Sequence, residues 1–535
     1  MSEPISLQNN WNIEIPADIG LVGGQILKEN DPYRLIGEGV SDFLKLKDFA
    51  FLYSPIGRGG ICPILLSLVT VFQFLENLPD REAARAVGVR LDWKFALHLP
   101  LADPGFHYSD LSNFRGRLLE HEAERMIFEK VLDWVRALGF LKKHGKQRTD
   151  STRILGNVER LSRLELAWES LRLALRAIHT AAEGWYQEVI PATFHQAYSE
   201  RHSDWRLSAE EAKSELYRAA CDGYWLLERL EAAPAEVRQL PEVVTFQTVW
   251  EQQFECGSGK VVVRQPARGQ GKDTIDSPHD PEARWAEKRG KEWLGYRLQV
   301  TETAEESQEV QFLTDVDAEA ANADDSECVD DLQERLIARD LKPEKHFTDS
   351  GYISGPNLAH SEARKIQLLG PALADNSKKP EGYKQRDFQI DFEAQQVTCP
   401  QGRISRYWHE QPVEAGRVEV TVQFKGQCEG CPARHLCAPG KSGRSLTICP
   451  YHAELTQRRA EQETETFKEK MKKRSAIEGT ISELTRKHGA RRARYRGKVK
   501  VRLQALFTGA AVNLKRLARA QIARKQAVCQ ATLSC

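Results

Sequence analysis

Four cysteines lie close together in one polar stretch of the chain. Three of them, Cys428, Cys431 and Cys437, have C-x2-C-x5-C spacing within QCEGCPARHLCAPG, and Cys399 in TCPQG is the fourth. A C-x2-C turn can direct two thiolates to one tetrahedral Zn²⁺, and structural zinc sites fill four positions. The spacing therefore predicts a structural zinc site in a segment that has few apolar residues.

Other chemistries use the same spacing and stay open on the sequence alone. An iron–sulfur cluster is also held by cysteine thiolates, and a C-x2-C pair can be a redox pair. His435 and Cys449 are substitute ligands within the same stretch. The remaining interpretation is that the four cysteines bind nothing.

Acidic residues at the ends of predicted strands are the second group that could do chemistry. Asp150 lies in a predicted strand and Asp349 follows another, while Glu478 comes early in a helical segment. Adjacent strand ends bring side chains to one edge of a sheet. Three carboxylates there would repel one another unless hard cations such as Mg²⁺ or Mn²⁺ neutralised them. An acid after a strand is more often a turn former, so spacing alone does not select these three from 76 acids.

The elements that would position these acids are read from periodicity. Alternation predicts a strand at 146–155 and a hairpin of 296–303 with 308–316. An amphipathic pattern predicts a helix at 328–340, and further strands are predicted at 345–351 and 366–373. A long charged helical stretch, roughly 158–235, interrupts the order. The pattern indicates a mixed α/β core with large insertions.

The region before this core, 36–140, is predicted to be helical. The apolar run 63–75 is typical of a core helix, and Asp80 and Ser109 are predicted N-caps of two further helices. Short helices joined by tight turns are what a helix-turn-helix needs, with Asn113, Arg115 and Arg117 reaching a groove. A helical packing domain fits the same pattern.

The charge of the chain is strongly segregated although 76 Lys and Arg balance 76 Asp and Glu. Residues 301–334 carry thirteen acids and no Lys or Arg, whereas 486–502 carry nine Lys or Arg and no acid. A basic block this dense usually contacts a polyanion, most often DNA or RNA. The other interpretation is a solvated helix face.

Composition limits the class of protein. The chain has 535 residues, of which 41% are hydrophobic and 28% charged, as in ordinary globular proteins of about three domains. No apolar run reaches the length of about 18 residues that a membrane span needs, and MSEPISLQNN lacks the layout of a signal peptide. We therefore expect a cytoplasmic protein, without membrane contacts, whose scattered cysteines are free thiols.

Several motifs resemble the DDE transposases of bacterial insertion sequences. The N-terminal stretch from GRGGICPILL to NFRGRLLE resembles that group's helical domain, and TDSTRILGNVERL its first Asp motif. SPHDPEARWAEKRGKEWLGYRLQV resembles the region before the second catalytic strand. TDSGYISGPNL matches the second Asp motif, and RSAIEGTISELTRKHGARRARYRGKVKVRLQALFTGAAVNLKRL the motif with the Glu. The resemblance covers roughly residues 36–520 and points to the subgroup with a cysteine-bearing insertion.

The resemblance selects the three acids and implies their chemistry. Asp150, Asp349 and Glu478 take the catalytic positions on an RNase H-like core and bind two Mg²⁺ or Mn²⁺ ions. Two such ions about 3.5–4 Å apart would activate a water or 3′-hydroxyl and stabilise the leaving oxygen. Asp276 and Asp280 are the strongest rivals for the first position. Asp150 is preferred because it lies in the strand-like first Asp motif.

Four segments follow from the motifs and the predicted elements. Residues 1–140 are an N-terminal helical domain that binds DNA, and 141–374 are the RNase H-like catalytic core with its insertion. Residues 375–450 are a β-rich insertion that bears the cysteines. Residues 451–535 are helical and complete the core.

The expected partner is double-stranded DNA, both the terminal inverted repeats and the target, bound by a homodimer associated with the bacterial nucleoid. Arg and Lys neutralise phosphates without reading sequence. The residues expected to do so here are Arg284, Lys288, Arg474, Arg486, Lys487, Arg491, Arg492, Arg494, Arg496 and Lys498.

The chain departs from the family signature at three positions. Met471 stands where the signature has Tyr, Thr485 where it has Lys, and Ser350 where Gly is commoner. The resemblance implies that the first two positions contact DNA near the cleavage site. The predicted function is a transposase that cuts and joins DNA; the alternatives are a catalytically inactive or repurposed DNA-binding protein and a metal-dependent nuclease of the same fold.

Overall fold

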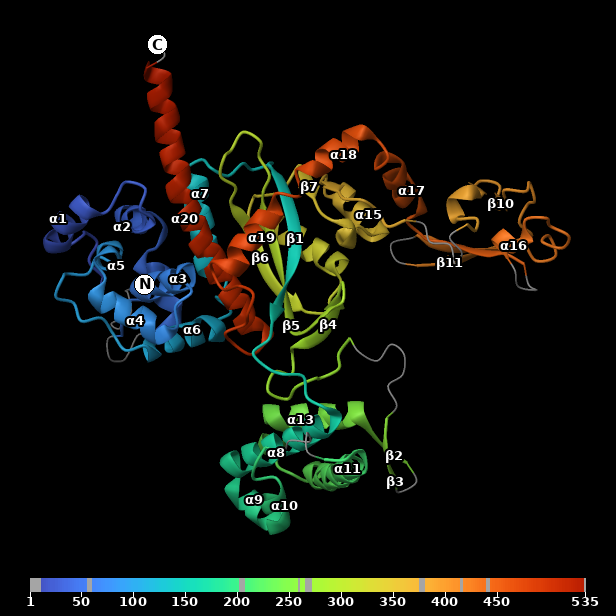
Figure 1. The fold of residues 1–535 in the computed structure, drawn as a ribbon, viewed down its shortest axis with the longest axis horizontal. Coiled ribbons are helices and arrows are strands. Elements are labelled where there is room, and N and C mark those ends of the chain that lie inside the picture. Colours follow the sequence, from blue (N-terminus) through green and yellow to red (C-terminus); the bar gives the residue numbers. More distant parts are fainter. Residues whose placement is uncertain are drawn as a thin grey trace.

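The computed structural model describes residues 11–54, 60–201, 207–257, 260–264, 272–374, 381–413, 417–438 and 443–533. The first ten residues, on which the signal-peptide argument rests, lie outside them. The fold is mixed α/β, as predicted. In Figure 1 the N-terminal helices and the C-terminal helix lie to the left of a central sheet and further helices to its right, while a helical insertion lies below it and a small β module projects to the right. Among the described helices none is long and apolar enough to cross a membrane.

The N-terminal region is helical, as the sequence predicts. The core helix α3 has twelve buried residues and begins with a proline, which suits the first turn of a helix because its nitrogen needs no partner there. The helices are α1 (Ala17–Ile26), α2 (Pro32–Phe43), the short 3₁₀ helix η2 (Leu46–Leu52), α3 (Pro63–Leu75), α4 (Asp80–Val89), α5 (Leu91–Ala96), α6 (Ser109–Glu120) and α7 (Met126–Ala137).

The two predicted helix caps in this region are wrong. Asp80 is the first residue of α4, and its side chain makes an ion pair with Arg115 at 2.6 Å instead of capping a backbone N–H. Ser109 likewise begins α6 without capping it. Arg115 is buried by this ion pair, so it does not reach outward as a groove-reading side chain would. At Asp80 the cap signal is outweighed by a tertiary partner that lies far away in sequence.

The central sheet has the strand order β4-β5-β1-β7-β8, and β6 also pairs with β5. β1 (Lys146–Leu155) pairs antiparallel with β5 (Lys291–Thr303) and parallel with β7 (Lys345–Phe347). β7 continues in parallel to β8 (Gln367–Leu369). The remaining strands are β4 (Arg284–Lys288) and β6 (Leu313–Ala320), both antiparallel to β5. The predicted strand 146–155 is confirmed residue for residue.

The other core elements are confirmed in type, with shifted bounds. The predicted hairpin is β5 with β6, but β6 begins only at Leu313, because the amide of Gln311 donates to the carbonyls of Glu305 and Gln308 and holds the preceding residues in a turn. The helix predicted at 328–340 is α14 (Val329–Ala338), preceded by η3 (Asp325–Cys328). After β7 come η4 (Ser350–Tyr352) and α15 (Gly355–Ala363).

The long C-terminal helix α20 (Lys498–Leu533) joins the N-terminal helices to the sheet (Figure 1). Phe507 of α20 stacks on Phe74 of α3, with ring centroids 6.1 Å apart. On its other side the amide of Asn513 donates to the carbonyl of Leu313 on β6 and accepts from the Leu313 N–H. The apolar residues of α20 thus belong to one continuous core with α3, α7 and the sheet.

The helical insertion follows β1 and has a core of its own. It runs further than the predicted 158–235, because α13 ends only at Gln253. Ser162 and Glu165 form a capping box that starts its first helix. Its elements are α8 (Arg163–Ala181), α9 (Glu183–Val189), α10 (Ala192–Ala197), α11 (Ala209–Glu231), α12 (Ala235–Arg238), α13 (Pro241–Gln253) and the hairpin of β2 (Phe254–Gly257) with β3 (Lys260–Val263).

The cysteine-bearing segment forms a small β module after β8. The core cluster formed by its described residues has seven buried apolar members, far fewer than the main core or that of the helical insertion. The module has η5 (Gln385–Asp387), β9 (Gln389–Asp391), β10 (Gln396–Thr398), β11 (Tyr407–Pro412), β12 (Val418–Gln423), α16 (Arg434–Cys437) and β13 (Ser445–Ile448). The chain then returns to the sheet through α17 (His452–Glu461), α18 (Glu465–Lys472) and α19 (Ile477–Arg486).

Candidate functional site

Asp150 and Asp349 are brought together by the parallel pairing of β1 with β7. Arg148 on β1 pairs with Phe347 on β7, so each aspartate lies two residues beyond the same pair. Paired strands are about 4.8 Å apart, so equal offsets keep the two aspartates close. The Asp349 carboxylate accepts a hydrogen bond from the Gly351 N–H at 2.9 Å, which fixes it at the start of η4.

The surroundings of Asp150 are poor in water and rich in charge. Its side chain is 13% exposed, and Arg474 lies 3.2 Å from its Oδ2. Burial raises the pKa of Asp150 and the charge of Asp349 raises it further, whereas Arg474 and Lys288 lower it. A carboxylate whose ionisation is disfavoured by burial and by a neighbouring carboxylate marks a place where a cation would be stabilised.

Glu478 lies on α19 and is exposed. It follows Arg474, the partner of Asp150, by about one helical turn, in a continuous run of turns: the Ile477 N–H donates to the Arg474 carbonyl and the Glu478 N–H to the Ser475 carbonyl. The start of α19 is therefore held beside the edge of β1 that carries Asp150. That all three carboxylates meet at one point stays a prediction.

A buried ion network holds α19 in this place. The Glu302 carboxylate on β5 is fully buried and binds Arg148 at 2.6 Å and Arg516 of α20 at 3.0 Å. It also accepts from the Thr480 hydroxyl of α19 at 2.7 Å. Arg148 in turn donates to the Lys473 carbonyl at 2.9 Å. We call these residues the Glu302 network; it ties two strands and two helices around the start of α19.

Sequence reasoning missed a third aspartate near the pair. Asp325 is buried, binds Arg297 at 2.9 Å and lies 3.9 Å from Lys288. A side chain at Gly351 would meet the carboxylates of Asp349 and Asp325 at 3.1 and 3.2 Å, so both border this glycine. Asp325 lies in the acidic stretch 301–334, which the sequence showed only as a charge imbalance, so no local signal marked it.

Tyr352 is a second residue that the sequence reasoning passed over. It is fully buried, and its hydroxyl donates to the Gln299 side chain of β5. Burial, together with the charges of Asp325 and Asp150, raises its pKa well above the usual value, so the hydroxyl stays protonated and acts as a donor. The motif TDSGY contained this signal, since its tyrosine follows Asp349 by one turn of η4.

The two rival aspartates have structural partners. Asp280 is buried and accepts from the Tyr296 hydroxyl at 2.7 Å and the Gly497 N–H at 3.1 Å. Asp276 makes an ion pair with Arg160 at 3.1 Å. Asp280 thereby joins the loop before β4 to β5 and to the start of α20. This structural role accounts for its burial without a catalytic role.

Two departures from the family signature also have local partners. Met471 is partly buried against the apolar cluster that contains Phe347 and Phe467, beneath β7 and β8. The Thr485 hydroxyl donates to the Ile481 carbonyl at 2.8 Å within α19. Met471 therefore supports the strand before Asp349, and Thr485 faces its own helix.

The basic residues expected to contact DNA divide into two groups. One group contacts the protein itself: Arg491 donates to the Arg153 carbonyl at 2.9 Å, and Arg494 lies 2.6 Å from the Asn77 oxygen. The same group contains Arg474 with Asp150, Lys498 with Glu319 and Arg284 with the Ala283 carbonyl. The other group consists of Arg486, Lys487, Arg492, Arg496 and, beside Asp325, Lys288, which have more solvent around them.

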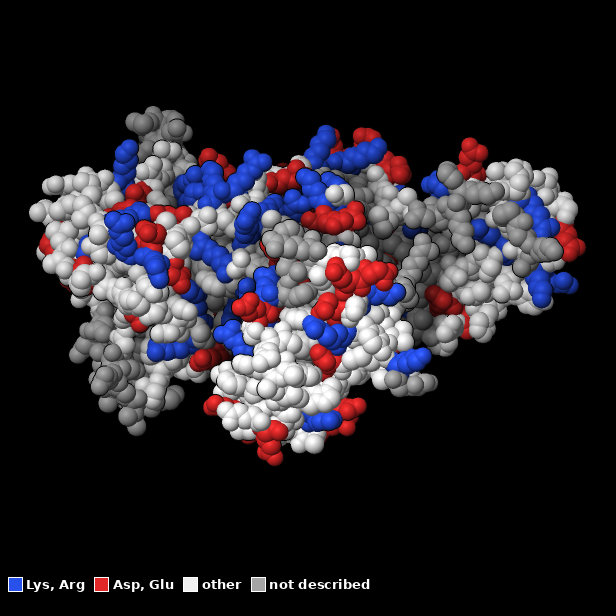
Figure 2. Space-filling model, turned by 60° about the horizontal axis from the view of Figure 1, so that its bottom comes forward, with Lys and Arg blue, Asp and Glu red and all other residues white. Residues whose placement is uncertain are grey.

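Part of the basic block thus pairs with the acidic stretch. Arg502 binds Asp317 at 2.6 Å, and Lys498 lies 3.5 Å from Glu319. On the face drawn in Figure 2, Lys and Arg side chains spread over the upper middle of the molecule, while the helical insertion below carries fewer. A groove of ≈ 700 Å³ that includes Lys487, Lys515 and Arg519 in its lining lies between the N-terminal helices and α20.

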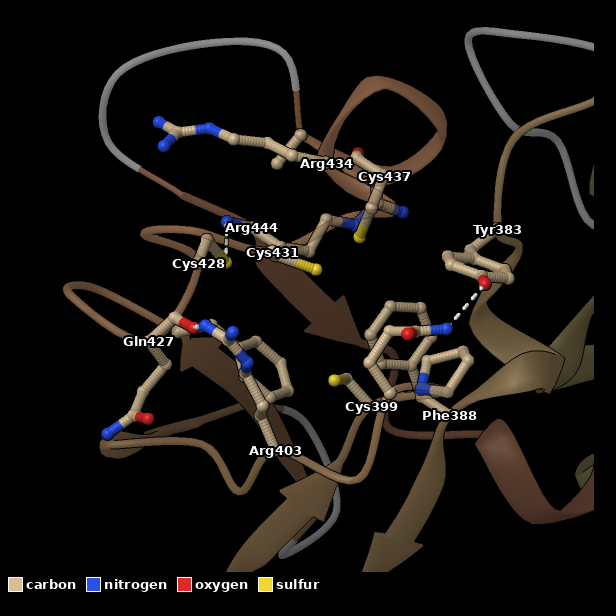
Figure 3. Close-up of a pocket in the computed structure, with 14 residues that line it drawn as sticks. Tyr383, Phe388, Cys399, Arg403, Gln427, Cys428, Cys431, Arg434, Cys437 and Arg444 are labelled. Carbon is tan, nitrogen blue, oxygen red and sulfur yellow. Dashed lines mark hydrogen bonds between the residues drawn. The ribbon is translucent and has the colours of Figure 1, made fainter.

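The four cysteines line one cavity of ≈ 20 Å³. Figure 3 shows their sulfurs directed toward a common space between two loops. Burial raises the pKa of the Cys437 thiol; the Arg444 charge lowers it, and the other three cysteines raise it because like charges repel. We call this space, lined by Cys399, Cys428, Cys431 and Cys437, the cysteine cavity. The nine cysteines whose side chains the structure describes are all free.

The donor atoms of the two sites suit different metals. Carboxylate oxygens suit Mg²⁺ or Mn²⁺, and thiolates suit Zn²⁺. As the side chains are placed, no group of three His, Cys, Asp or Glu residues within the described ranges is arranged to hold an ion. The mutual repulsion of Asp150 and Asp349 and the convergence of four sulfurs are the observations that fit cations.

Comparison with known proteins gave two matches to protein families. A family described as a transposase DDE domain matches residues 398–518, and one described as a transposase domain (DUF772) matches residues 22–117. No curated protein and no solved structure matched. The first match contains all four cysteines of the cavity and Glu478, and the second contains α2 to most of α6; Asp150 and Asp349 lie outside both. The two matches together support a DDE transposase.

Proposed function

We propose that this chain is a DNA transposase that cleaves and joins DNA at the ends of an insertion sequence by metal-dependent phosphoryl transfer. The observation that carries the proposal is the pair of aspartates brought together by the parallel pairing of β1 with β7, one on β1 and one just after β7, beside the helix that bears Glu478. The sheet would be the RNase H-like core. The subgroup is the one with a cysteine-bearing insertion, a module that here lies between β8 and α17.

In the proposed mechanism the carboxylates bind the metal ions and nearby cationic side chains orient the phosphate. Asp150, Asp349 and Glu478 would hold two Mg²⁺ or Mn²⁺ ions, which supply activation of the attacking hydroxyl and stabilisation of the leaving oxygen. Before the ions bind, Arg474 neutralises Asp150 at 3.2 Å. Arg474 and Lys288 then lie where a scissile phosphate would approach, so both can orient it by charge.

The proposed partner is double-stranded DNA, held by a homodimer. The cations at the end of α19, Arg486 and Lys487, lead from the start of that helix toward the groove lined by Lys515 and Arg519. Backbone phosphates bound along this line would position the DNA end at the carboxylates. Such contacts make binding strongly dependent on salt.

The test is a cleavage and strand-transfer assay on duplex DNA that carries the inverted repeats flanking the gene. We expect Mg²⁺-dependent products from the wild-type chain and none from Asp150→Asn or Asp349→Asn, while gel-shift binding is retained by both. Asp276→Asn is the matched control, because the Asp276 side chain pairs with Arg160 outside the carboxylate pair and the change should leave cleavage intact.

Each outcome of this assay decides between functions. Binding without cleavage by the wild-type chain would replace the proposal with a DNA-binding protein that has lost catalysis. Cleavage without dependence on the repeats, and without joining, would replace it with a nuclease. Loss of cleavage in Asp276→Asn but not in Asp150→Asn would move the site to the rival aspartate.

A further inference from the structure

Two tight turns present the cysteines of the module. In the first, the Gly402 N–H donates to the Cys399 carbonyl at 2.8 Å, and Gly402 has φ +74°. In the second, Gly430 between Cys428 and Cys431 has φ +65°. Glycine adopts this left-handed conformation without steric penalty. Each turn therefore has a backbone that places a cysteine at its start.

Arg403 joins the two turns to each other, and Arg444 joins the second turn to Cys437. Arg403, at the end of the first turn, donates to the carbonyls of Gln427 and Glu429 on either side of Cys428. Arg444 donates through its side chain to the Cys437 carbonyl at 3.2 Å and through its backbone N–H to the Cys428 sulfur at 3.5 Å. Protein hydrogen bonds thus set the scaffold that directs the four sulfurs inward (Figure 3).

The lining of the cysteine cavity has the chemistry of a thiolate site. Besides the sulfurs it includes the rings of Phe388 and Phe424 and the side chains of Arg403 and Arg444, but no carboxylate from the described residues. Four thiolates around one divalent ion leave a net negative charge, which the two arginines would offset. Four soft sulfur donors, with no carboxylate among the described lining residues, favour zinc over magnesium or calcium.

The size of the cavity favours a single ion. A volume of ≈ 20 Å³ holds one water-sized body, whereas an iron–sulfur cluster contains several iron and sulfide atoms. Thiol side chains move among staggered positions by rotation about one bond. Zinc binding at the usual Zn–S distance of about 2.3 Å would require the sulfurs to approach one another by such rotations.

The module also has a physical need for a cross-link. The core cluster of its described residues has seven buried apolar members, and its described cysteines form no disulfide. Small domains with so little buried apolar surface usually depend on a metal or on disulfides. We propose that the cysteine cavity holds one structural Zn²⁺, bound by Cys399, Cys428, Cys431 and Cys437. This site is independent of the carboxylates and of the function proposed for them.

The first test measures metal in the purified full-length chain. Elemental analysis should find about one zinc and no iron per chain, and Cys428→Ser/Cys431→Ser should contain none. Cys256→Ser, on the exposed strand β2, and Cys449→Ser, outside the lining, are controls that should keep the zinc. Iron with visible absorbance, zinc retained by the double variant, or a metal-free chain with a disulfide would each overturn the proposal.

A second measurement covers the case in which the double variant fails to fold. The wild-type chain is stripped with a zinc-selective chelator in excess Mg²⁺ and refilled with Co²⁺, whose absorption reports the number of thiolate ligands and the tetrahedral geometry. We expect a four-thiolate tetrahedral spectrum that zinc abolishes. A spectrum of oxygen or nitrogen ligands, or no Co²⁺ uptake, would contradict the site.

Discussion

The edge of the sheet that carries Asp150 and Asp349, here called the carboxylate edge, and the cysteine cavity differ in how far apart in sequence the residues that build them lie. Asp150 and Asp349 are neighbours only because β1 and β7 pair across the whole helical insertion and the hairpin of β5 and β6. The cysteine cavity is built by two turns within residues 399–437 and by arginines close to them. The first site thus depends on the global fold, and the second on local turns and, as we propose, on a metal.

This difference predicts how each site fails. Loss of a buried support in the Glu302 network should weaken the whole core, because that network joins two strands to α19 and α20. Loss of the metal should loosen the module alone, because its small core is separate from the main one. The following experiments are ordered from the largest expected effect to the smallest.

The largest effect is expected from Glu478→Gln. Glu478 is exposed, so the change should leave stability untouched while cleavage falls by at least about 10²–10³-fold, the range for losing one preorganised electrostatic group at a reaction centre. Glu469→Gln, on the exposed face of α18 where it pairs with Lys472, is the control and should cleave normally. Normal cleavage by Glu478→Gln would show that the carboxylate edge uses a different third acid, with Asp325 as the nearest replacement.

Glu302→Gln should produce the largest loss of stability. It leaves the buried guanidinium group of Arg148 without its counter-charge and leaves Arg516 with Glu483 as its remaining carboxylate, which costs about 3–5 kcal/mol of unfolding free energy. Chemical denaturation measures this, with Glu306→Gln as an exposed control that should unfold like the wild type. If amide hydrogen exchange in the Glu302→Gln variant rises as much in β12 of the module as in β5 of the core, the prediction that core and module lose stability separately is wrong.

His346 should make the stability of the core depend on pH. Burial lowers its pKa to about 4 from the usual value of about 6.5. Because the folded-state pKa is the lower one, the unfolded chain takes up this proton first, so stability is full above about pH 6.5 and falls as the pH drops toward about 4. The loss should be about 3 kcal/mol. His346→Gln should remove that part of the slope; an unchanged slope would assign the dependence to the carboxylates.

The smallest effect concerns the cations after α19. Changing Arg486, Lys487 and Arg492 together to Gln should weaken DNA binding and flatten its salt dependence, by about 0.9 in slope for each phosphate that is no longer neutralised. Arg494→Gln is the counterpart: it removes hydrogen bonds to Asn77 and Leu78, so it should lower the melting temperature and leave the slope unchanged. A flatter salt dependence in Arg494→Gln, with none in the triple variant, would indicate that the DNA contacts Arg494 instead.

A triple change at Arg491, Arg492 and Arg494, three neighbouring members of the basic block, would combine a loss of DNA contact with a loss of stability. Arg491 and Arg494 donate to backbone carbonyls of the protein, whereas Arg492 belongs to the group expected to meet phosphate. Sequence could identify the block as basic but could not tell which members face inward. Which arginines face inward depends on partners that are distant in sequence. Asp317 of β6 binds Arg502, the Leu78 carbonyl after α3 accepts from Arg494, and the Arg153 carbonyl near the end of β1 accepts from Arg491.

Local sequence patterns determined the secondary-structure elements and identified the cysteines that could bind a metal. The alternation in 146–155 predicted β1 to the residue, the apolar run 63–75 predicted α3, and the C-x2-C spacing marked residues that share a cavity. These features are properties of neighbouring residues, so a short window of sequence contains them. The three-acid assignment came instead from the resemblance of longer motifs, since an acid after a strand has no unique local sign.

Only the tertiary structure decided what lies next to what. It paired β1 with β7 and so set Asp150 beside Asp349, placed Asp325 against Gly351, and turned Asp80 from a helix cap into the partner of Arg115. Each of these contacts joins residues far apart in sequence. Their energies come from burial and charge that exist only once the chain is folded, and no local pattern of residues records them.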